Sequence, residues 1–377
     1  MAAAAQVAEP VPVTFVISHA QSGGSERYLE LLVERLEPGW VRGFLSLQEG
    51  PFVERLRERG IPVDVVETGA RLSMLPAALR VRRVLRRQGP AVIHANGVKA
   101  ALVTALAGSG IPIVWIKHDF SWDGPLATFI ASRCQQVVGV SAAVTETFGP
   151  RQRRKVHVVH NGIPPIAADR AAGRELVREL LDGADPDDAV ILVGRLHPAK
   201  GHIELVEAVP RVLERRPETR FLLLGGEDPY QLPYARRVRE RVTELGIDHA
   251  VAFQPHHEDA PTVIAGCAVA VMPSVPDERG MGREGFGLVG LEAMAVGTPV
   301  VAYAAGALPE VLGDCAEMVP EGDRAGLADT VVRLLDDPQR REELVACGTE
   351  MMRTRFSLES TVAGMVERYR DAASSSK

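Results

Sequence analysis

Short apolar runs alternate with longer helical patterns along almost the whole chain, and this alternation limits its fold more than any other feature. Alternating strands and helices predict parallel sheets whose strands are joined by crossover helices. The runs are rich in valine and isoleucine, which predicts sheets covered on both faces. Helices are predicted between them, for example at 26–36, 75–87 and 99–107. The predicted strands are 13–18, 43–47, 63–66, 91–94, 113–117, 136–140 and 156–159, followed by 189–193, 220–224, 251–253, 269–272, 300–302 and 317–319.

The alternation lapses between Asn161 and Asp188, where Pro164 and Pro165 precede a polar, Asp-rich stretch. A chain of 377 residues is also too long for one typical core. We therefore predict an α/β protein with two domains, residues 1–165 and 189–356, and a linker at 166–188. Two doubly wound, Rossmann-like domains facing one another would hold a ligand between the carboxyl ends of their sheets.

The bulk composition is that of an ordinary soluble enzyme, with 46% hydrophobic and 24% charged residues. A net charge of −6 argues against nucleic acid as a partner. The four cysteines are widely scattered, so we expect neither a disulfide framework nor a zinc site. The N-terminus does not resemble a signal peptide, and no apolar run is long enough to span a membrane. A cytoplasmic protein in a reducing compartment is expected.

The segment 269–295 carries the most chemical information. A strand ends at Pro273, and a helix is predicted to begin near Gly287, with Glu284 and Glu292 on either side of the helix start. Eight helical residues rise about 12 Å, roughly the length of a sugar-diphosphate-ribose unit. The free amides at the helix N-terminus would bind an anion between the two carboxylates. The pattern suits a nucleotide sugar; the alternative is an ordinary strand–loop–helix with two surface glutamates.

A second motif follows the predicted strand 189–193 and reads G-R-L-H-P-A-K-G from Gly194 to Gly201. Its glycines allow a ligand to approach the backbone closely. Arg195 offers a planar fork to phosphate oxygens, and Lys200 offers a mobile point charge. Taken alone, the two cations would be read as solvated loop residues. Together with the glutamate-bearing segment, they favour a site for a diphosphate leaving group.

The pattern G-R-x-x-x-x-K-G, followed by P-S…E-G-F-G-x-x-x-x-E-A-M-A-x-G-x-P-V-V up to Val301, resembles the retaining glycosyltransferases of family four. The resemblance implies a GT-B fold with a deep cleft between the domains. It also implies that a last helix, about 357–377, returns to the first domain, although packing within the second domain is the alternative. Further points of resemblance are Gly23-Gly24, His94-Ala95-Asn96-Gly97, His118, Val140-Ser141 and Asn161-Gly162-Ile163.

The family resemblance implies the role of each site residue. Glu284 would contact the hydroxyls of the donor sugar, Glu292 would bind the ribose hydroxyls, and His118 would lie beside the donor sugar. A packed or surface histidine is the alternative for His118. The implied catalytic set is His118, Glu284, Arg195 and Lys200, and the implied donor-binding set is Gly23, Gly24, Arg195, Lys200, His256, Phe286, Gly287, Leu288 and Glu292.

Other assignments concern the acceptor and the base. Asp119 and Asp123 would line the acceptor side, and the alternative for Asp123 is to cap the helix that begins at Gly124-Pro125. Base recognition is expected at 253–256, where Pro255 replaces a glycine that is common in the family. The loop 276–283 is longer than usual in the family. It would either become ordered over the substrate or be no more than an enlarged surface loop.

The implied reaction is metal-independent transfer of a sugar, with retention, to a hydroxyl of a small-molecule, glycan or lipid-linked acceptor. No cofactor is expected besides the donor, a UDP-sugar first and a GDP-sugar second. A nucleotide-sugar 2-epimerase-type isomerase and a noncatalytic nucleotide-sugar-binding protein are the alternatives. The arginines of helix 79–87 would form a solvated basic face or make weak contact with anionic membranes. The alanine- and arginine-rich composition suggests a bacterial source.

Overall fold

The structure is a computed structural model that describes residues 9–18, 20, 23–68, 74–276 and 282–375. The chain forms two compact units. The first unit is Met1–Gly162 together with Leu358–Lys377, and the second unit is Ile163–Ser357. Each unit contains a parallel sheet with helices on both faces, and the units are described separately below. In the described residues, no helix is long and apolar enough to cross a membrane.

The described strands of the first unit form one parallel sheet in the order β3-β2-β1-β4-β5-β6-β7. Every residue of the central strands β1, β4 and β5 is buried, which fits their largely apolar sequence. The strand order reverses between β1 and β4, so the carboxyl ends of these strands are the expected ligand position. The strands are β1 (Val13–Ile17), β2 (Val41–Ser46), β3 (Val63–Val65), β4 (Val92–Asn96), β5 (Ile113–Lys117), β6 (Gln136–Gly139) and β7 (Val156–Val158).

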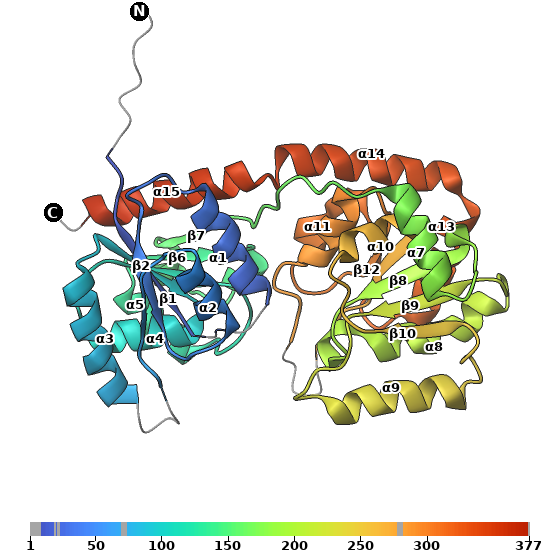
Figure 1. The fold of residues 1–377 in the computed structure, drawn as a ribbon, viewed down its shortest axis with the longest axis horizontal. Coiled ribbons are helices and arrows are strands. Elements are labelled where there is room, and N and C mark those ends of the chain that lie inside the picture. The colour runs from blue at the N-terminus through green and yellow to red at the C-terminus, as the bar shows by residue number, and fades with distance from the viewer. Residues whose placement is uncertain (1–8, 19, 21–22, 69–73, 277–281, 376–377) are drawn as a thin grey trace, which may run out of the picture. The chain divides into compact units, whose positions relative to one another are not determined.

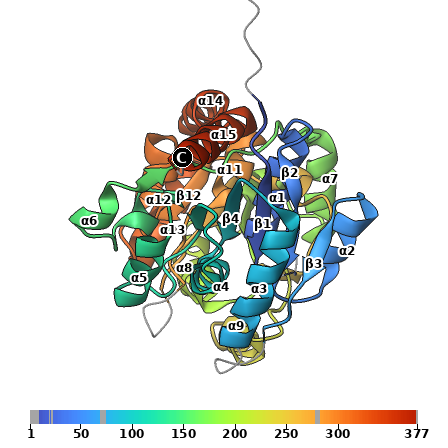
Figure 2. The same cartoon turned by 90° about the vertical axis from the view of Figure 1, so that its left-hand side faces the viewer.

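Helices of the first unit cover both faces of its sheet, as Figure 2 shows. Helix α4 contacts β1, β4 and β5, and α3 and α5 pack against it. On the other face, the chain's last helix, α15, contacts β4, β5 and α1. The helices are α1 (Gly24–Arg35), α2 (Pro51–Glu58), α3 (Met74–Gln88), α4 (Val98–Ala107), α5 (Pro125–Arg133), α6 (Pro150–Arg153) and α15 (Leu358–Ser374).

The described part of the second unit repeats this topology with the strand order β10-β9-β8-β11-β12-β13. The reversal now lies between β8 and β11, which pair in parallel through Val269 and Val190. Both strands are almost entirely buried, and they belong to a core that also includes Phe221 and Leu327. The strands are β8 (Ala189–Val193), β9 (Arg220–Leu224), β10 (Val251–Gln254), β11 (Val269–Met272), β12 (Val300–Tyr303) and β13 (Glu317–Val319).

The helices of the second unit also form two layers (Figure 1). Helix α8 packs against α9 and α13, and α10 packs against α7 and α11. Aspartates cap several of them: Asp323 caps α13 and Asp337 caps α14, each by accepting a backbone N–H. The helices are α7 (Arg170–Leu180), α8 (His202–Leu213), α9 (Leu232–Glu244), α10 (Ala260–Gly266), α11 (Leu288–Ala295), α12 (Leu308–Leu312), α13 (Arg324–Asp336) and α14 (Pro338–Thr354).

The stretch 166–188, predicted to be a linker, instead contains helix α7. Asp169 caps this helix by accepting from the amides of Ala171 and Ala172. Gly173 and Gly266 allow α7 and α10 to touch, because a Cβ atom on Gly173 would lie 2.2 Å from the carbonyl oxygen of Thr262. The polar, Asp-rich sequence therefore reflects a capped surface helix rather than a free connection.

The scattered cysteines predicted no disulfide framework, but the structure contains a disulfide. Cys315 and Cys347 are bonded, with their Cα atoms 5.2 Å apart. Cys315 ends the short 3₁₀ helix Gly313–Cys315, which packs against α14, where Cys347 lies. Their separation of 32 residues matches no local spacing rule, so only the tertiary contact brings them together. Cys134 and Cys267 are free and buried.

Candidate active site

The two sequence motifs of the second unit meet at its topological switch point. The loop after β8 carries Gly194 to Gly201, and the loop after β11 leads to Glu284 and α11. Gly201 adopts a φ of +69°, and a Cβ atom there would lie 1.7 Å from the carbonyl oxygen of Pro273, the residue that follows β11. A side chain at position 201 would therefore push the two loops apart.

Lys200 and Glu284 form the central contact between these loops. The Nζ of Lys200 donates to Oε2 of Glu284 at 2.7 Å, although the two residues are 84 positions apart. The Lys200 side chain is 37% exposed and that of Glu284 is 15% exposed. Gly306 supports the Glu284 backbone from the loop after β12, since a Cβ atom on Gly306 would lie 2.4 Å from the Glu284 carbonyl oxygen. A lysine ammonium thus lies directly beside a half-buried carboxylate.

The backbone amides of Phe286 and Gly287 also donate to the Glu284 carboxylate. Burial by itself would raise the pKa of this carboxyl group. The Lys200 charge, its hydrogen bond and the two amides outweigh burial and hold the pKa below the usual range. Glu284 is therefore ionised at neutral pH. Three donors, the Lys200 ammonium and two backbone amides, therefore converge on this one internal carboxylate.

Helix α11 begins immediately after these amides. Gly287 is its N-cap residue, with a φ of +93°, and a Cβ atom there would lie 2.6 Å from Cδ2 of Leu308. Phe286 is only 4% exposed, and its ring packs edge-on against Phe356. Leu288 is the first helical residue and Glu292 lies on the half-buried part of the same helix. The predicted helix start is correct, and the amides that precede it already have a carboxylate partner.

Arg195 has a partner that the sequence motif did not reveal. Its Nη1 lies 3.0 Å from Oδ2 of Asp228, which follows β9. The Asp228 side chain is 4% exposed, whereas that of Arg195 is 63% exposed. Asp228 also accepts from the amide of Tyr230 at 2.9 Å. A fixed, buried carboxylate thus holds an exposed guanidinium at the carboxyl end of the sheet.

The predicted base-recognition segment borders a cavity of about 210 Å³. Phe253, Gln254 and Pro255 line it, together with Gly194 from the loop after β8 and Arg239 from helix α9. The guanidinium of Arg239 lies 4.3 Å from the centre of the Phe253 ring. His256 is exposed and is not among the residues that line the cavity. The loop prediction at 276–283 lies partly outside the described residues, which resume at Gly282.

In the first unit, His118 directly follows β5. Its Nε2 lies 2.6 Å from Oδ1 of Asn96, the last residue of the neighbouring strand β4. The Tyr28 ring packs edge-on against the imidazole, with ring centres 5.4 Å apart. Gly23 is the N-cap residue of α1 and Gly24 is its first residue, so both lie at the start of the helix that carries Tyr28.

Asp119 and Asp123 both make contacts within the first unit. The Asp119 carboxylate accepts from the amide of Ser121 at 2.9 Å. Asp123 forms an ion pair at 2.7 Å with Lys117, whose side chain is only 1% exposed. The alternative reading of Asp123 as a helix cap is wrong, because Gly124 is the N-cap residue of α5 and no side chain caps it. The buried lysine explains why an aspartate is needed here.

Sequence models of known families match both halves of the chain. The model for glycosyltransferase family 4 matches residues 22–165, and the model for group 1 glycosyl transferases matches residues 187–337. A D-inositol 3-phosphate glycosyltransferase from Nocardioides sp. is 33% identical over 342 residues, which cover 79% of this chain and 72% of the relative. This chain belongs to glycosyltransferase family 4.

Other family 4 proteins match over shorter stretches. A GDP-mannose-dependent monoacylated alpha-(1-6)-phosphatidylinositol monomannoside mannosyltransferase from Corynebacterium glutamicum is 29% identical over 197 residues, which cover 52% of this chain and 49% of the relative. The chain spans about half the length of the first curated relatives that it matches.

Among solved structures, HepE from Anabaena in complex with UDP superimposes with a TM-score of 0.82 at 22% identity, covering 96% of this chain and 100% of HepE. This likeness shows that the fold is GT-B.

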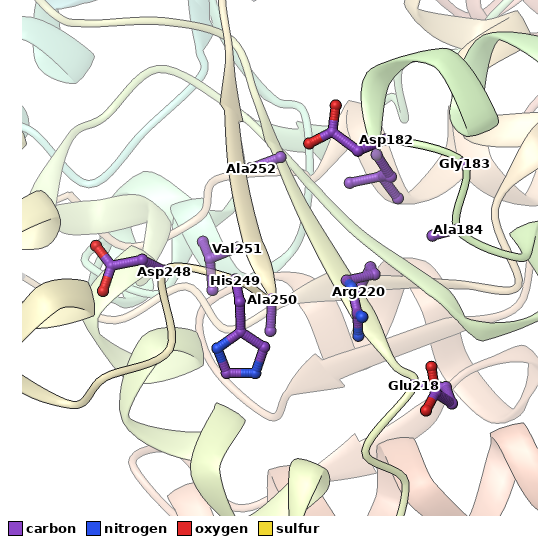
Figure 3. Close-up of a pocket in the computed structure, with 11 residues that line it drawn as sticks. Asp182, Gly183, Ala184, Glu218, Arg220, Asp248, His249, Ala250, Val251 and Ala252 are labelled. Carbon is purple, nitrogen blue, oxygen red and sulfur yellow. The ribbon is translucent and has the colours of Figure 1, made fainter.

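A further pocket in this family 4 chain lies away from the residues described above (Figure 3). It has a volume of about 380 Å³ and is lined by Arg220, Val251, Asp182 and His249 among others. Arg220 and Val251 are the first residues of β9 and β10, so the pocket lies at the amino ends of these strands. Within the described ranges, no group of three or more His, Cys, Asp or Glu side chains is arranged to hold a metal ion.

Proposed function

We propose that this protein is a glycosyltransferase that transfers a sugar, with retention, from a nucleoside diphosphate sugar to an acceptor hydroxyl. One observation carries the proposal: Lys200 and the amides of Phe286 and Gly287 converge on a single anion at the switch point between β8 and β11. A donor diphosphate is an anion of the kind that such a site binds. Family membership supports the same conclusion.

The side chains would act on the leaving group and on the sugar. Lys200 and Arg195 would stabilise the negative charge that grows on the departing diphosphate. Glu284 would accept hydrogen bonds from hydroxyls of the donor sugar, and Glu292 from those of the ribose. The acceptor oxygen would bond to the anomeric carbon as the bond from that carbon to the diphosphate breaks, and the acceptor proton would pass to a diphosphate oxygen. No step in this scheme calls for a metal ion.

Relatives guide the choice of substrates. HepE has been solved with UDP-glucose, and a relative from Corynebacterium glutamicum is named as GDP-mannose-dependent. We therefore propose a UDP-sugar as the first donor to test and a GDP-sugar as the second. Several relatives are named D-inositol 3-phosphate glycosyltransferases, which supports a polyhydroxylated small molecule or glycan as the acceptor. We also propose that the protein is cytoplasmic and that helix α3 makes weak contact with membranes.

The decisive experiment measures nucleoside diphosphate release by the wild type and by Glu284→Ala across uridine, guanosine and adenosine diphosphate sugars. Each reaction is run alone and with a panel of acceptors that includes inositol phosphate and free sugars. We expect acceptor-dependent release from one donor, lost in the variant, and a product with the same anomeric configuration as the donor. Conversion of the donor without an acceptor would instead indicate an isomerase. Binding without turnover across the panel would indicate a noncatalytic protein, and an inverted product would refute retention.

A further inference from the structure

The disulfide between Cys315 and Cys347 joins two elements that both pack on α11, the helix that begins at the candidate active site. Cys315 ends the 3₁₀ helix Gly313–Cys315, which directly follows α12. Cys347 lies in α14, and the 3₁₀ helix contacts both α12 and α14. The bond therefore links α12 to α14 covalently, and each of these helices has its own contacts with α11.

Helix α12 packs closely against the start of α11. A Cβ atom on Gly287 would lie 2.6 Å from Cδ2 of Leu308, whose side chain is fully buried. The backbone amide of Ala307, the N-cap residue of α12, donates to the carbonyl oxygen of Glu284 at 2.9 Å. Because a packed core leaves no free space for adjustment, a shift of α12 would also move the backbone of Glu284 and the start of α11.

Helix α14 packs against the carboxyl-terminal half of α11. Gly348, the residue after Cys347, is buried, and a Cβ atom there would lie 3.1 Å from Cβ of Met294 in α11. The guanidinium of Arg355, the C-cap residue of α14, also donates to the carbonyl oxygen of Glu310 in α12 at 3.3 Å. This hydrogen bond is exposed, so it would connect the two helices only weakly after reduction of the disulfide.

The two bonded cysteines differ in their access to solvent. Cys347 is half-buried, whereas Cys315 is 6% exposed. A thiolate of a dithiol reductant therefore attacks Sγ of Cys347 and forms a mixed disulfide with it, while the bond to Cys315 breaks and Cys315 leaves as a thiolate. The second thiol of the reductant then closes the reductant's own disulfide and releases Cys347, so two electrons and two protons pass from the dithiol to the protein. Cys134 and Cys267 are free and buried, which confines the exchange to the bonded pair.

We propose that the pair Cys315 and Cys347 is a reversible redox modification site that controls the geometry at the start of α11. A dithiol reductant opens the bond, and a disulfide oxidant closes it again. In the oxidised state the bond holds α12 and α14 against α11, and reduction loosens the support of Glu284 and of the amides beside it. A disulfide in a reducing cytoplasm is usually transient or redox-sensing, which agrees with the proposed location. The consequence for donor binding rests on the proposed function, whereas the redox reaction and its effect on α11 do not.

The first test needs no substrate. Native protein is treated with oxidised glutathione or with dithiothreitol, alkylated with iodoacetamide and analysed by peptide mass spectrometry. We expect dithiothreitol to expose Cys315 and Cys347 to alkylation without unfolding the protein, and oxidised glutathione to restore the bond. In hydrogen–deuterium exchange, the amides of residues 284–291 should exchange about tenfold faster in the reduced protein, because local opening becomes easier. A bond that does not form, that opens only in urea, or that opens with no change in this exchange would overturn the inference.

Two kinds of variant separate the bond from the thiols themselves. Cys315→Ala combined with Cys347→Ala cannot form the bond, and it should show the exchange of the reduced wild type under both redox conditions. Cys134→Ala is the matched control, because it removes a buried free thiol from the first unit and should keep the full redox difference. If the double variant does not fold, Cys347→Ser alone serves instead, since position 347 is half-buried. A redox difference that persists without the bond would overturn the inference.

Nucleotide binding provides a separate readout once a donor is known. Reduction of the wild type should weaken the binding of the nucleoside diphosphate by about 5- to 10-fold, since a less preorganised site binds its ligand less tightly. Calorimetric titration of the oxidised and the reduced protein measures this difference, and the double variant should give the lower affinity under both conditions. Failure of the donor screen would refute the proposed function and leave the exchange result standing. Equal affinities in the two redox states, in protein whose exchange at α11 differs, would refute redox control of the site.

Discussion

The two units place polar side chains at the carboxyl ends of similar sheets, but the kinds of interaction differ. In the second unit the contacts are ion pairs whose cation is partly exposed, Lys200 with Glu284 and Arg195 with Asp228. In the first unit the cluster around His118 is neutral and buried, with hydrogen bonds in place of charges. Partly exposed ion pairs are weak and can be exchanged for other partners, whereas a buried neutral network keeps one geometry.

The ion pairs of the second unit suit the proposed reaction. A diphosphate brings its own charge and must displace an existing partner of Lys200, so an exchangeable ion pair suits that side chain. The exception in the first unit is Lys117, a buried cation that depends on Asp123. Substitutions in the two units can test whether the charged partners exchange and whether the buried groups stay fixed.

Removal of the Lys200 ammonium should cause the largest loss of sugar-transfer activity. Lys200→Ala should reduce the rate of sugar transfer by about 10²- to 10³-fold, because one electrostatic contact with the leaving group is lost. Stability should change little, since the lysine is partly exposed. Arg211→Ala is a suitable control, because Arg211 forms an exposed ion pair with Asp329 on the helices α8 and α13. Steady-state kinetics on both variants make the comparison, and full activity in Lys200→Ala would contradict the proposed mechanism.

Removal of a partner from the buried pair of the first unit should instead reduce stability. Asp123→Ala leaves the Lys117 ammonium buried without its carboxylate, and should lower the free energy of unfolding by about 3 kcal/mol. The double variant Lys117→Met with Asp123→Ala should recover most of that loss, because no uncompensated charge remains. Urea denaturation measures both effects. Equal stability of the single variant and the wild type would show that Lys117 does not depend on Asp123.

The same double variant tests the predicted contact of Asp123 with the acceptor. If the double variant is as stable as the wild type but has an increased KM for the acceptor, Asp123 contacts the acceptor as well as pairing with Lys117. A normal KM would assign Asp123 to the ion pair alone. Stability and kinetics must be compared in the same preparation for this reason.

The sequence predicted the elements of the fold well, because strand signals are local. The buried strands β5, β8 and β11 lie at their predicted residues, since continuous apolar runs bounded by turns fix them. The linker prediction missed helix α7, because a capped surface helix and a linker share a polar composition.

The partners of the site residues could not be predicted from local patterns. Asp228 meets Arg195, and Asn96 meets His118, only because neighbouring strands end side by side. The position of each residue at a strand end was a usable signal, but nothing in the spacing selected these two from the other polar residues there. The bond between Cys315 and Cys347 likewise depends on the packing of α14. Contacts of this kind require the tertiary structure.

Neutralisation of Glu284 should strengthen the binding of product while weakening catalysis. Glu284→Gln removes the internal anion from Lys200 and the two amides, so a nucleoside diphosphate no longer competes with a carboxylate. We expect its affinity to rise by about tenfold, or roughly 1.4 kcal/mol, while sugar transfer falls. Calorimetric titration measures the affinity, with Glu204→Gln as a control because Glu204 pairs with Arg324 elsewhere in the unit. Weaker binding in Glu284→Gln would show that the carboxylate does not compete with the ligand.

The pH dependence of stability should distinguish the buried histidines from Glu284. Burial lowers the pKa of His94 to about 3 from an unfolded value of 6.5, so the unfolded chain binds the additional proton first as the pH falls. Between pH 7.5 and pH 5.5 this histidine should therefore reduce stability by about 1.4 kcal/mol. His118 and His202, whose pKa values are each lowered to about 4, should contribute similar losses.

Glu284 should contribute no change in that range. Its pKa in the folded protein is lowered, so its stabilising contribution is complete above the unfolded value of 4.5 and is lost only as the pH falls further. Urea denaturation of the wild type and of His94→Gln at pH 7.5 and pH 5.5 tests this. The variant should lose about 1.4 kcal/mol less than the wild type on acidification, whatever its stability at pH 7.5. An equal loss in both proteins would mean that His94 is accessible to protons in the folded state, and that the cluster in the first unit is as exchangeable as the ion pairs in the second.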